Sequence, residues 1–92
     1  MSKSPQTPAD RRISELFATE LPMISRRFEE ALDARADLGM VEIANDLAQL
    51  ANDLLLFAVR NARTESNESW ENIGDALDMS RQAAWERFSK LV

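Results

Sequence analysis

The side chains best equipped for recognition chemistry lie near the C-terminus, in the stretch SWENIGDALDMSRQAAWERF, residues 69–88. Helical spacing places Ala84, Phe88 and Leu91 on one apolar face of a predicted helix over residues 80–91. The other side of that helix is polar or amphipathic, with Gln82, Glu86 and Ser89 opposite the apolar face and Arg81 and Trp85 on its flank. A helix held by its apolar face can offer these groups as hydrogen-bond donors and acceptors to another molecule.

Two short helices and a tight turn are predicted to position these side chains. Ser69 and Ser80 suit the capping positions of helices that begin directly after them. Gly74 leaves room for the second helix to cross the first closely, and residues 78–80 form the turn. We expect Trp70 to anchor the core. A helix pinned to its predecessor, with its N-terminal polar side outward, has the geometry of a helix-turn-helix.

The same stretch resembles the helix-turn-helix of bacterial transcriptional regulators. It is most similar to the tail of short actinobacterial regulators that combine SW..IG with SRQAA..RF, found here at residues 69–74 and 80–88. One departure is Asp78, at a turn position that such families usually fill with glycine. Asp tolerates the left-handed conformation better than most residues, so we expect the turn to form. Its negative charge would weaken phosphate contact near the start of the second helix.

The resemblance implies that this second helix contacts bases in the major groove of DNA. The implied base-contacting residues are Ser80, Arg81, Gln82, Trp85 and Glu86. Arg81 would bind guanine, Gln82 adenine and Glu86 cytosine. The implied phosphate contacts are Arg60, Arg63, Arg87 and Lys90, together with the N-terminus of the helix that begins at Trp70.

Net charge argues against this interpretation. The chain has 16 acidic and 11 basic residues, a net charge of −5, and residues 58–92 hold six acids and five bases. Such a protein repels nucleic acid at long range. A dimer could keep its acidic residues on the outer N-terminal helices, away from the DNA-contacting helices. Within a Debye length of about 8–10 Å, the charge of nearby residues then matters more than the net charge of the protein. The alternative is an acidic helical adaptor or anti-regulator that binds a transcription protein and not DNA.

The N-terminal part is predicted to be helical after a disordered arm at residues 1–8, where Pro5 and Pro8 oppose a helix. Apolar residues then recur at helical spacing as far as Leu32. Pro22 interrupts this run. The sequence favours a first helix that ends near Glu20 and a second that begins at Pro22, with one kinked helix as the alternative. Gly39 suits the left-handed position that closes the second helix.

Residues 40–63 are predicted to form one long central helix with two apolar stripes. The first is a heptad seam of Ile43, Leu47, Leu50, Leu54 and Phe57. The second stripe consists of Ala44, Ala48, Ala51, Leu55, Ala58 and Ala62, and the first four are the interface candidates. One stripe would pack on the preceding helix and the other on a second chain. The sequence does not show which stripe does which, so residues of both are candidates for a homodimer interface. A 92-residue chain buries only about 60–65% of its unfolded surface, so dimer formation would add stability.

The absence of His and Cys disfavours an enzyme or a zinc site. The acidic stretch at residues 29–37 matches no ligand motif, and we expect no catalytic residue, metal or cofactor. No apolar run approaches the roughly 20 residues that span a bilayer. We therefore expect a cytoplasmic, nucleoid-associated, all-α protein of four to five helices. Residues 9–63 would form a dimerisation region and residues 64–92 a helix-turn-helix packed on it, as one domain. The expected function is sequence-specific DNA binding by a small transcriptional regulator.

Overall fold

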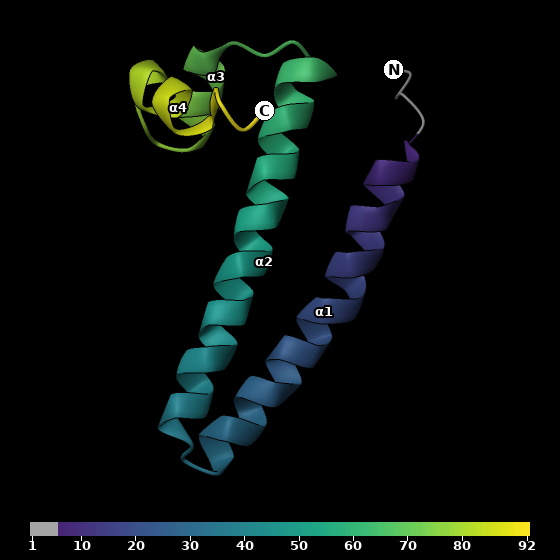
Figure 1. The fold of residues 1–92 in the computed structure, drawn as a ribbon, viewed down its shortest axis with the longest axis vertical. Helices are drawn as coiled ribbons and strands as arrows, with labels where there is room; N and C mark the ends of the chain where they lie inside the picture. The colour runs from purple at the N-terminus through teal and green to yellow at the C-terminus, as the bar shows by residue number, and fades with distance from the viewer. Residues whose placement is uncertain (1–5) are drawn as a thin grey trace. The chain divides into compact units, whose positions relative to one another are not determined.

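The computed structural model describes residues 6–92, and all regular structure in that range is helical. The four helices are α1 (Pro8–Asp33), α2 (Asp37–Thr64), α3 (Trp70–Ala76) and α4 (Arg81–Phe88) (Figure 1). The all-α class and the number of helices are confirmed. The long helix begins three residues earlier than Met40, the start that the apolar pattern predicts.

The chain divides into two compact units, one ending at Ala51 and the other beginning at Asn52. The division falls within α2. The first half of this helix therefore packs with α1, and its second half packs with α3 and α4. The predicted boundary lay after the long helix, because the sequence shows no break in its apolar pattern.

Helix α1 begins with a capping box. The Thr7 hydroxyl accepts from the Asp10 backbone N–H at 3.0 Å, and the Asp10 carboxylate accepts from the Thr7 N–H at 2.9 Å. Pro8 occupies the first turn, where its missing N–H needs no partner. The expectation that Pro8 belongs to a disordered arm is therefore wrong. Residues 1–5 of that predicted arm lie outside the described residues.

Pro22 lies inside α1, and the predicted break there is wrong. An interior proline costs a helix about 3 kcal/mol, through one lost hydrogen bond and a steric clash. Pro22 is exposed, whereas Ile24 two residues later is buried. The buried residues of α1, Ile24 and Ala31, both follow Pro22, and the helix nevertheless continues through the proline. The periodicity of the apolar residues was a better guide than the proline.

The turn between α1 and α2 is closed by Arg35 and not by Gly39. Arg35 has a φ of 54°, in the left-handed region. The Ala36 N–H donates to the Ala31 carbonyl at 2.8 Å and the Arg35 N–H to the Leu32 carbonyl at 3.1 Å. These two bonds form a Schellman motif with arginine at the position that glycine usually fills. Gly39 lies inside α2, so its predicted closing role is wrong.

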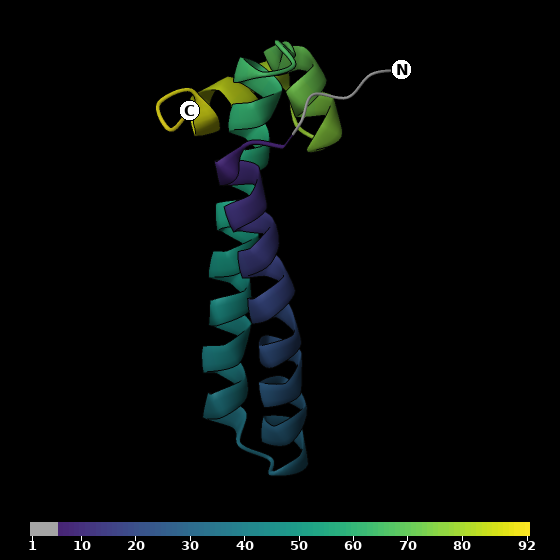
Figure 2. The ribbon, with the colours of Figure 1, turned by 90° about the vertical axis from the view of Figure 1, so that its right-hand side faces the viewer.

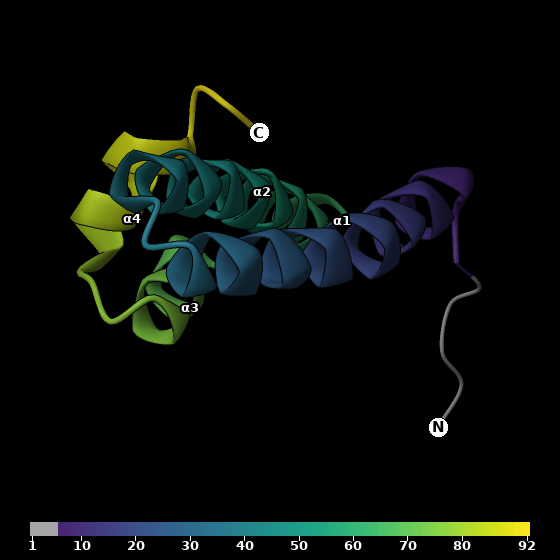
Figure 3. The same ribbon diagram turned by 90° about the horizontal axis from the view of Figure 1, so that it is seen from below.

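In the N-terminal unit, α1 and the first half of α2 form an antiparallel hairpin. Figure 2 and Figure 3 show the two helices side by side next to the turn, from two perpendicular directions. Few side chains are buried between them, namely Ile24, Ala31, Ile43 and Leu50. Leu47, a member of the predicted seam, remains 42% exposed. A bridge of 3.1 Å from Arg27 to Asp46 joins the helices along one edge.

The C-terminal unit has its own core of Val59, Ile73, Ala84 and Phe88. Partly buried apolar residues surround it: Leu55, Leu56, Ala62, Trp70, Leu77, Met79 and Val92. Leu55 and Ala62, from the stripe predicted to face a second chain, therefore pack within their own chain. This core holds α3 and α4 against the last turns of α2.

Candidate nucleic-acid interface

Polar contacts at both ends hold the loop before α3 in place. The Ser69 hydroxyl caps α3 by accepting from the Asn72 backbone N–H at 3.0 Å, as the sequence predicts. The Arg63 side chain donates to the Glu68 carbonyl at 2.8 Å. Its guanidinium also lies 4.9 Å from the centre of the Trp70 ring, within the range of a cation–π contact. Arg63 thus positions the start of α3.

The turn from α3 to α4 is a second Schellman motif. Asp78 has a φ of 56°, so the predicted left-handed Asp is confirmed. The Met79 N–H donates to the Gly74 carbonyl at 2.9 Å, and the Asp78 N–H donates to the Asp75 carbonyl at 3.3 Å. These bonds end α3, and the chain continues from Met79 directly to Ser80, the capping residue of α4.

Gly74 allows this turn to close. It is buried, and a Cβ on it would stand 2.7 Å from the Met79 carbonyl oxygen. The expected need for a small residue is confirmed. The close neighbour is, however, the backbone of the turn and not a side of the second helix.

Helix α4 is capped at one end and anchored along one face. The Ser80 hydroxyl accepts from the Ala83 backbone N–H at 3.0 Å. Ala84 and Phe88 are 0% and 1% exposed, and they fix the rotation of the helix about its axis. The rotation predicted from the apolar spacing is therefore correct for these two residues.

The predicted C-terminal end of this helix is wrong. Helix α4 ends at Phe88, and the backbone N–H groups of Leu91 and Val92 both donate to the Phe88 carbonyl. The chain turns there, which leaves Leu91 54% exposed and brings Val92 to the core. Helical spacing cannot predict that Val92 packs on the core in place of Leu91, because a prediction from spacing assumes that the helix continues to Leu91.

The five residues that the resemblance implies as base contacts are all exposed: Ser80, Arg81, Gln82, Trp85 and Glu86. Arg81, Gln82 and Trp85 together line a shallow depression of about 260 Å³. The Arg81 side chain has no hydrogen bond or ion pair with any part of the chain that the structure describes. The Gln82 amide donates to the Glu86 carboxylate at 3.0 Å, so these two side chains hold each other on the exposed face.

The four implied phosphate contacts differ in their surroundings. Arg60, Arg87 and Lys90 are exposed. Arg63 is partly buried and already engaged by Glu68 and Trp70. The sequence could not distinguish Arg63 from the other three residues, because all four carry one positive charge. Arg63 and Trp70 are seven residues apart with a loop between them, and this spacing does not predict a contact.

The C-terminal unit thus carries a short anchored helix whose free face holds a guanidinium, an amide and an indole. Residues 6–92 contain no group of three or more acidic side chains arranged to hold a metal ion. Within the same range, no helix is long and apolar enough to cross a membrane. The chain matches no model of a known protein family, no curated protein and no solved structure.

Proposed function

We propose that the protein binds double-stranded DNA through α4 and acts as a small transcriptional regulator. The observation that carries the proposal is the arrangement of α4. Ala84 and Phe88 hold it from behind, and Arg81 and Gln82 stand exposed at its N-terminal end. In helix-turn-helix proteins, the N-terminal residues of the second helix contact base edges in the major groove.

Arg81 is the strongest candidate for a base contact. Its guanidinium can donate two parallel hydrogen bonds to guanine, and no partner within the described residues competes for it. The Gln82 amide nitrogen has two N–H donors, and one of them donates to the Glu86 carboxylate at 3.0 Å. The other donor and the amide oxygen can form the bidentate contact to adenine while this bond is kept. The second carboxylate oxygen of Glu86 can still accept from cytosine.

The charge of the C-terminal unit limits affinity for arbitrary DNA. Residues 52–92 hold five basic and seven acidic side chains, and so a net charge of −2. Arg60, Arg87 and Lys90 remain exposed as phosphate contacts. We expect weak binding to random duplexes and tighter binding to a specific site. A homodimer would reinforce this preference by engaging two half-sites about 34–36 Å apart.

The direct test is a titration of the full chain against duplex DNA at falling salt, using wild type and Arg81→Ala. Binding should strengthen as salt is lowered, because phosphate contacts release counterions. Arg81→Ala should weaken binding to a specific site by roughly 1–3 kcal/mol, the range for a bidentate base contact. Arg26→Ala is the matched control, since Arg26 is exposed in α1 and the charge change is the same. Equal effects of the two substitutions would contradict the proposal.

A protein partner is the second candidate, favoured by Trp85. This side chain is 49% exposed beside Arg81, and Trp and Arg are enriched at the energetic centres of protein interfaces. An acidic adaptor that used this face would bind no duplex at any salt concentration. The titration above therefore separates the two functions.

A further inference from the structure

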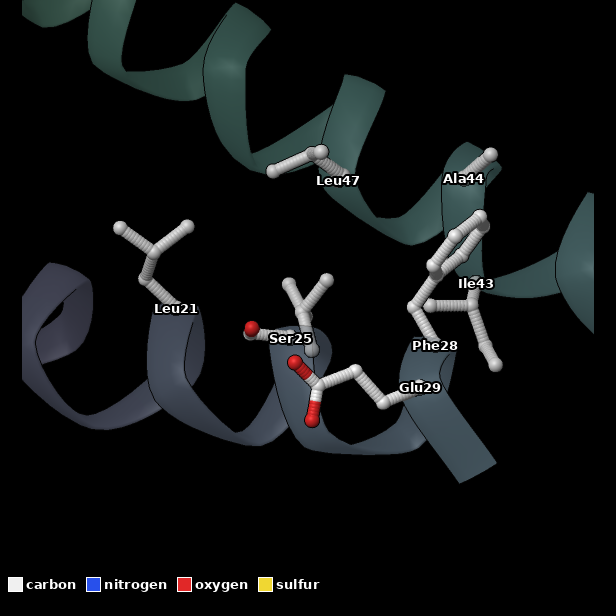
Figure 4. A pocket seen from close by; sticks show the side chains of 8 residues that line it. Leu21, Ser25, Phe28, Glu29, Ile43, Ala44 and Leu47 are labelled. Atoms are coloured by element: carbon white, nitrogen blue, oxygen red, sulfur yellow. The ribbon is translucent and has the colours of Figure 1, made fainter. Parts of the chain in front are cut away.

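The hairpin of the N-terminal unit carries an unpaired apolar face. Its members are Phe17, Leu21, Phe28 and Leu32 from α1 and Ala44, Leu47, Ala48 and Ala51 from α2, and all except the half-buried Leu21 are exposed. In the middle of this face lies a groove of about 360 Å³ between the two helices. Figure 4 shows the side chains of Leu21, Phe28 and Leu47 around this groove.

The hairpin buries too little to account for these residues. Its core consists of Ile24, Ala31, Ile43 and Leu50. A helix with an apolar stripe needs a second layer to cover that stripe, and two helices alone cover only the side on which they meet. The exposed face therefore calls for a further helical layer.

The charges around the hairpin restrict what this layer can be. The bridge between Arg27 and Asp46 joins the two helices, and neither of these residues lines the groove. The groove is lined by one charged residue, Glu29, and by no cation. A nucleic acid or an acidic peptide finds no complementary charge there. The face suits an apolar helical partner.

The α1 half and the α2 half of this face carry side chains of different size, so the face is complementary to a second copy of itself. The α1 half is bulky, with Phe and Leu side chains, whereas the α2 half is mostly alanine. We propose that the face pairs with the same face of a second copy, so that α1 of each copy lies on α2 of the other. Bulky side chains then fill the space above the alanines, in a closed four-helix bundle with an isologous interface.

The size of the face limits the strength of the dimer. Residues 17–32 extend about 22 Å along α1, at a rise of 1.5 Å per residue. Two helices about 8–10 Å apart, with their side chains, are roughly 20 Å wide. The flat area is then about 900 Å² for both copies before side-chain relief is counted, below the roughly 1,200 Å² at which standard interfaces begin, so we expect a dimer that dissociates on dilution.

This inference stands without the DNA-binding proposal, because it rests on the N-terminal unit alone. It also revises the interface that the sequence predicts. Ile43 and Leu50 are buried within the hairpin, and Leu55 packs against the core of the C-terminal unit. Four residues of α1 take part instead, and only Ala44, Leu47, Ala48 and Ala51 remain from the predicted set.

The test compares Ala44→Glu with Asn45→Glu in the full chain by sedimentation equilibrium. Both residues are exposed on α2, but Ala44 lines the groove and Asn45 does not. We expect wild type and Asn45→Glu to form dimers with the same dissociation constant. Ala44→Glu should weaken the dimer by at least tenfold, because a two-fold interface buries the added charge twice. Unchanged helicity by circular dichroism would show that the variant is folded.

Three results would overturn the inference. They are a wild type that stays monomeric at about 100 µM, a dimer that Ala44→Glu leaves intact, and equal weakening by both substitutions. Failure of the DNA proposal is visible separately, because Arg81→Ala should leave the dimer unchanged. A protein that dimerises but binds no DNA would contradict only the proposed function.

Discussion

Gly74 lies against the backbone of Met79, and this contact closes the turn between α3 and α4. A Cβ on Gly74 would stand 2.7 Å from the Met79 carbonyl oxygen, closer than two such atoms can approach without a shift. The Met79 N–H donates to the Gly74 carbonyl at 2.9 Å in the same turn. The orientation of α4, and with it the position of Arg81, depends on a glycine at this place.

Gly74→Ala should therefore destabilise the protein, by about 1–3 kcal/mol, as expected for overpacking against backbone. Gly39→Ala is the matched control. A Cβ there would meet the side chain of Ala36 at 3.4 Å, an ordinary contact, and Gly39 lies inside a helix. That variant should gain roughly 0.5–1 kcal/mol. Urea unfolding of the two variants checks both signs, and a stabilising Gly74→Ala would refute the close approach.

Arg35→Gly should stabilise the hairpin. A left-handed conformation costs a residue other than glycine about 1–2 kcal/mol, and Arg35 adopts it with a φ of 54°. We expect a gain near 1 kcal/mol, smaller than the full cost because glycine also gains freedom in the unfolded chain. Arg26→Gly, in the interior of α1, should lose about 1 kcal/mol. Thermal unfolding measures both variants. Midpoint temperatures that shift in the same direction from wild type in both would contradict the left-handed conformation of Arg35.

Asp78→Asn separates the shape of the α3–α4 turn from its charge. Asn tolerates the left-handed conformation about as well as Asp, so stability should change by less than about 0.5 kcal/mol. Loss of a negative charge beside the start of α4 should strengthen DNA binding, and more so at low salt. Glu15→Gln, exposed in α1, is the control for net charge. Fluorescence anisotropy of a labelled duplex would test this, and equal effects of the two substitutions would argue against contact near Asp78.

Phe88→Ala tests which residue anchors the end of α4. Phe88 is 1% exposed, and truncation of a buried Phe costs about 3–5 kcal/mol. Leu91 lies three residues further along and is 54% exposed, so Leu91→Ala should change stability by less than about 0.5 kcal/mol. Near-ultraviolet circular dichroism of the tryptophans would report loss of packing in the C-terminal unit. Comparable losses in both variants would mean that the helix continues past Phe88.

Local signals in the sequence predicted much of the C-terminal unit. Ser69 and Ser80 cap α3 and α4, and Asp78 takes the left-handed position between them. Each of these features depends on a few neighbouring residues, and residue type alone identifies them. The buried pair Ala84 and Phe88 was also predictable, because four residues separate neighbours on one helix face.

Features decided by tertiary packing were less predictable. Pro22 lies on an exposed side of α1, away from the buried Ile24 and Ala31, and the helix continues through it. Arg35 takes a position where glycine was expected, because the two helices must reverse direction at that point. Val59, buried in the core of the C-terminal unit, lies outside both predicted stripes of α2. It faces α3 and α4 because the packing partner of α2 changes at the middle of the helix, and a single periodic pattern cannot show that change.

Selection of bound sequences from a random duplex pool shows whether α4 recognises bases. Wild type should enrich a defined site, and Gln82→Ala should enrich a site that differs at one position, since base contacts set sequence preference and phosphate contacts do not. Arg81→Ala should lose a preferred guanine. A wild-type pool without enrichment at low salt, or identical sites from all three proteins, would contradict base recognition by α4.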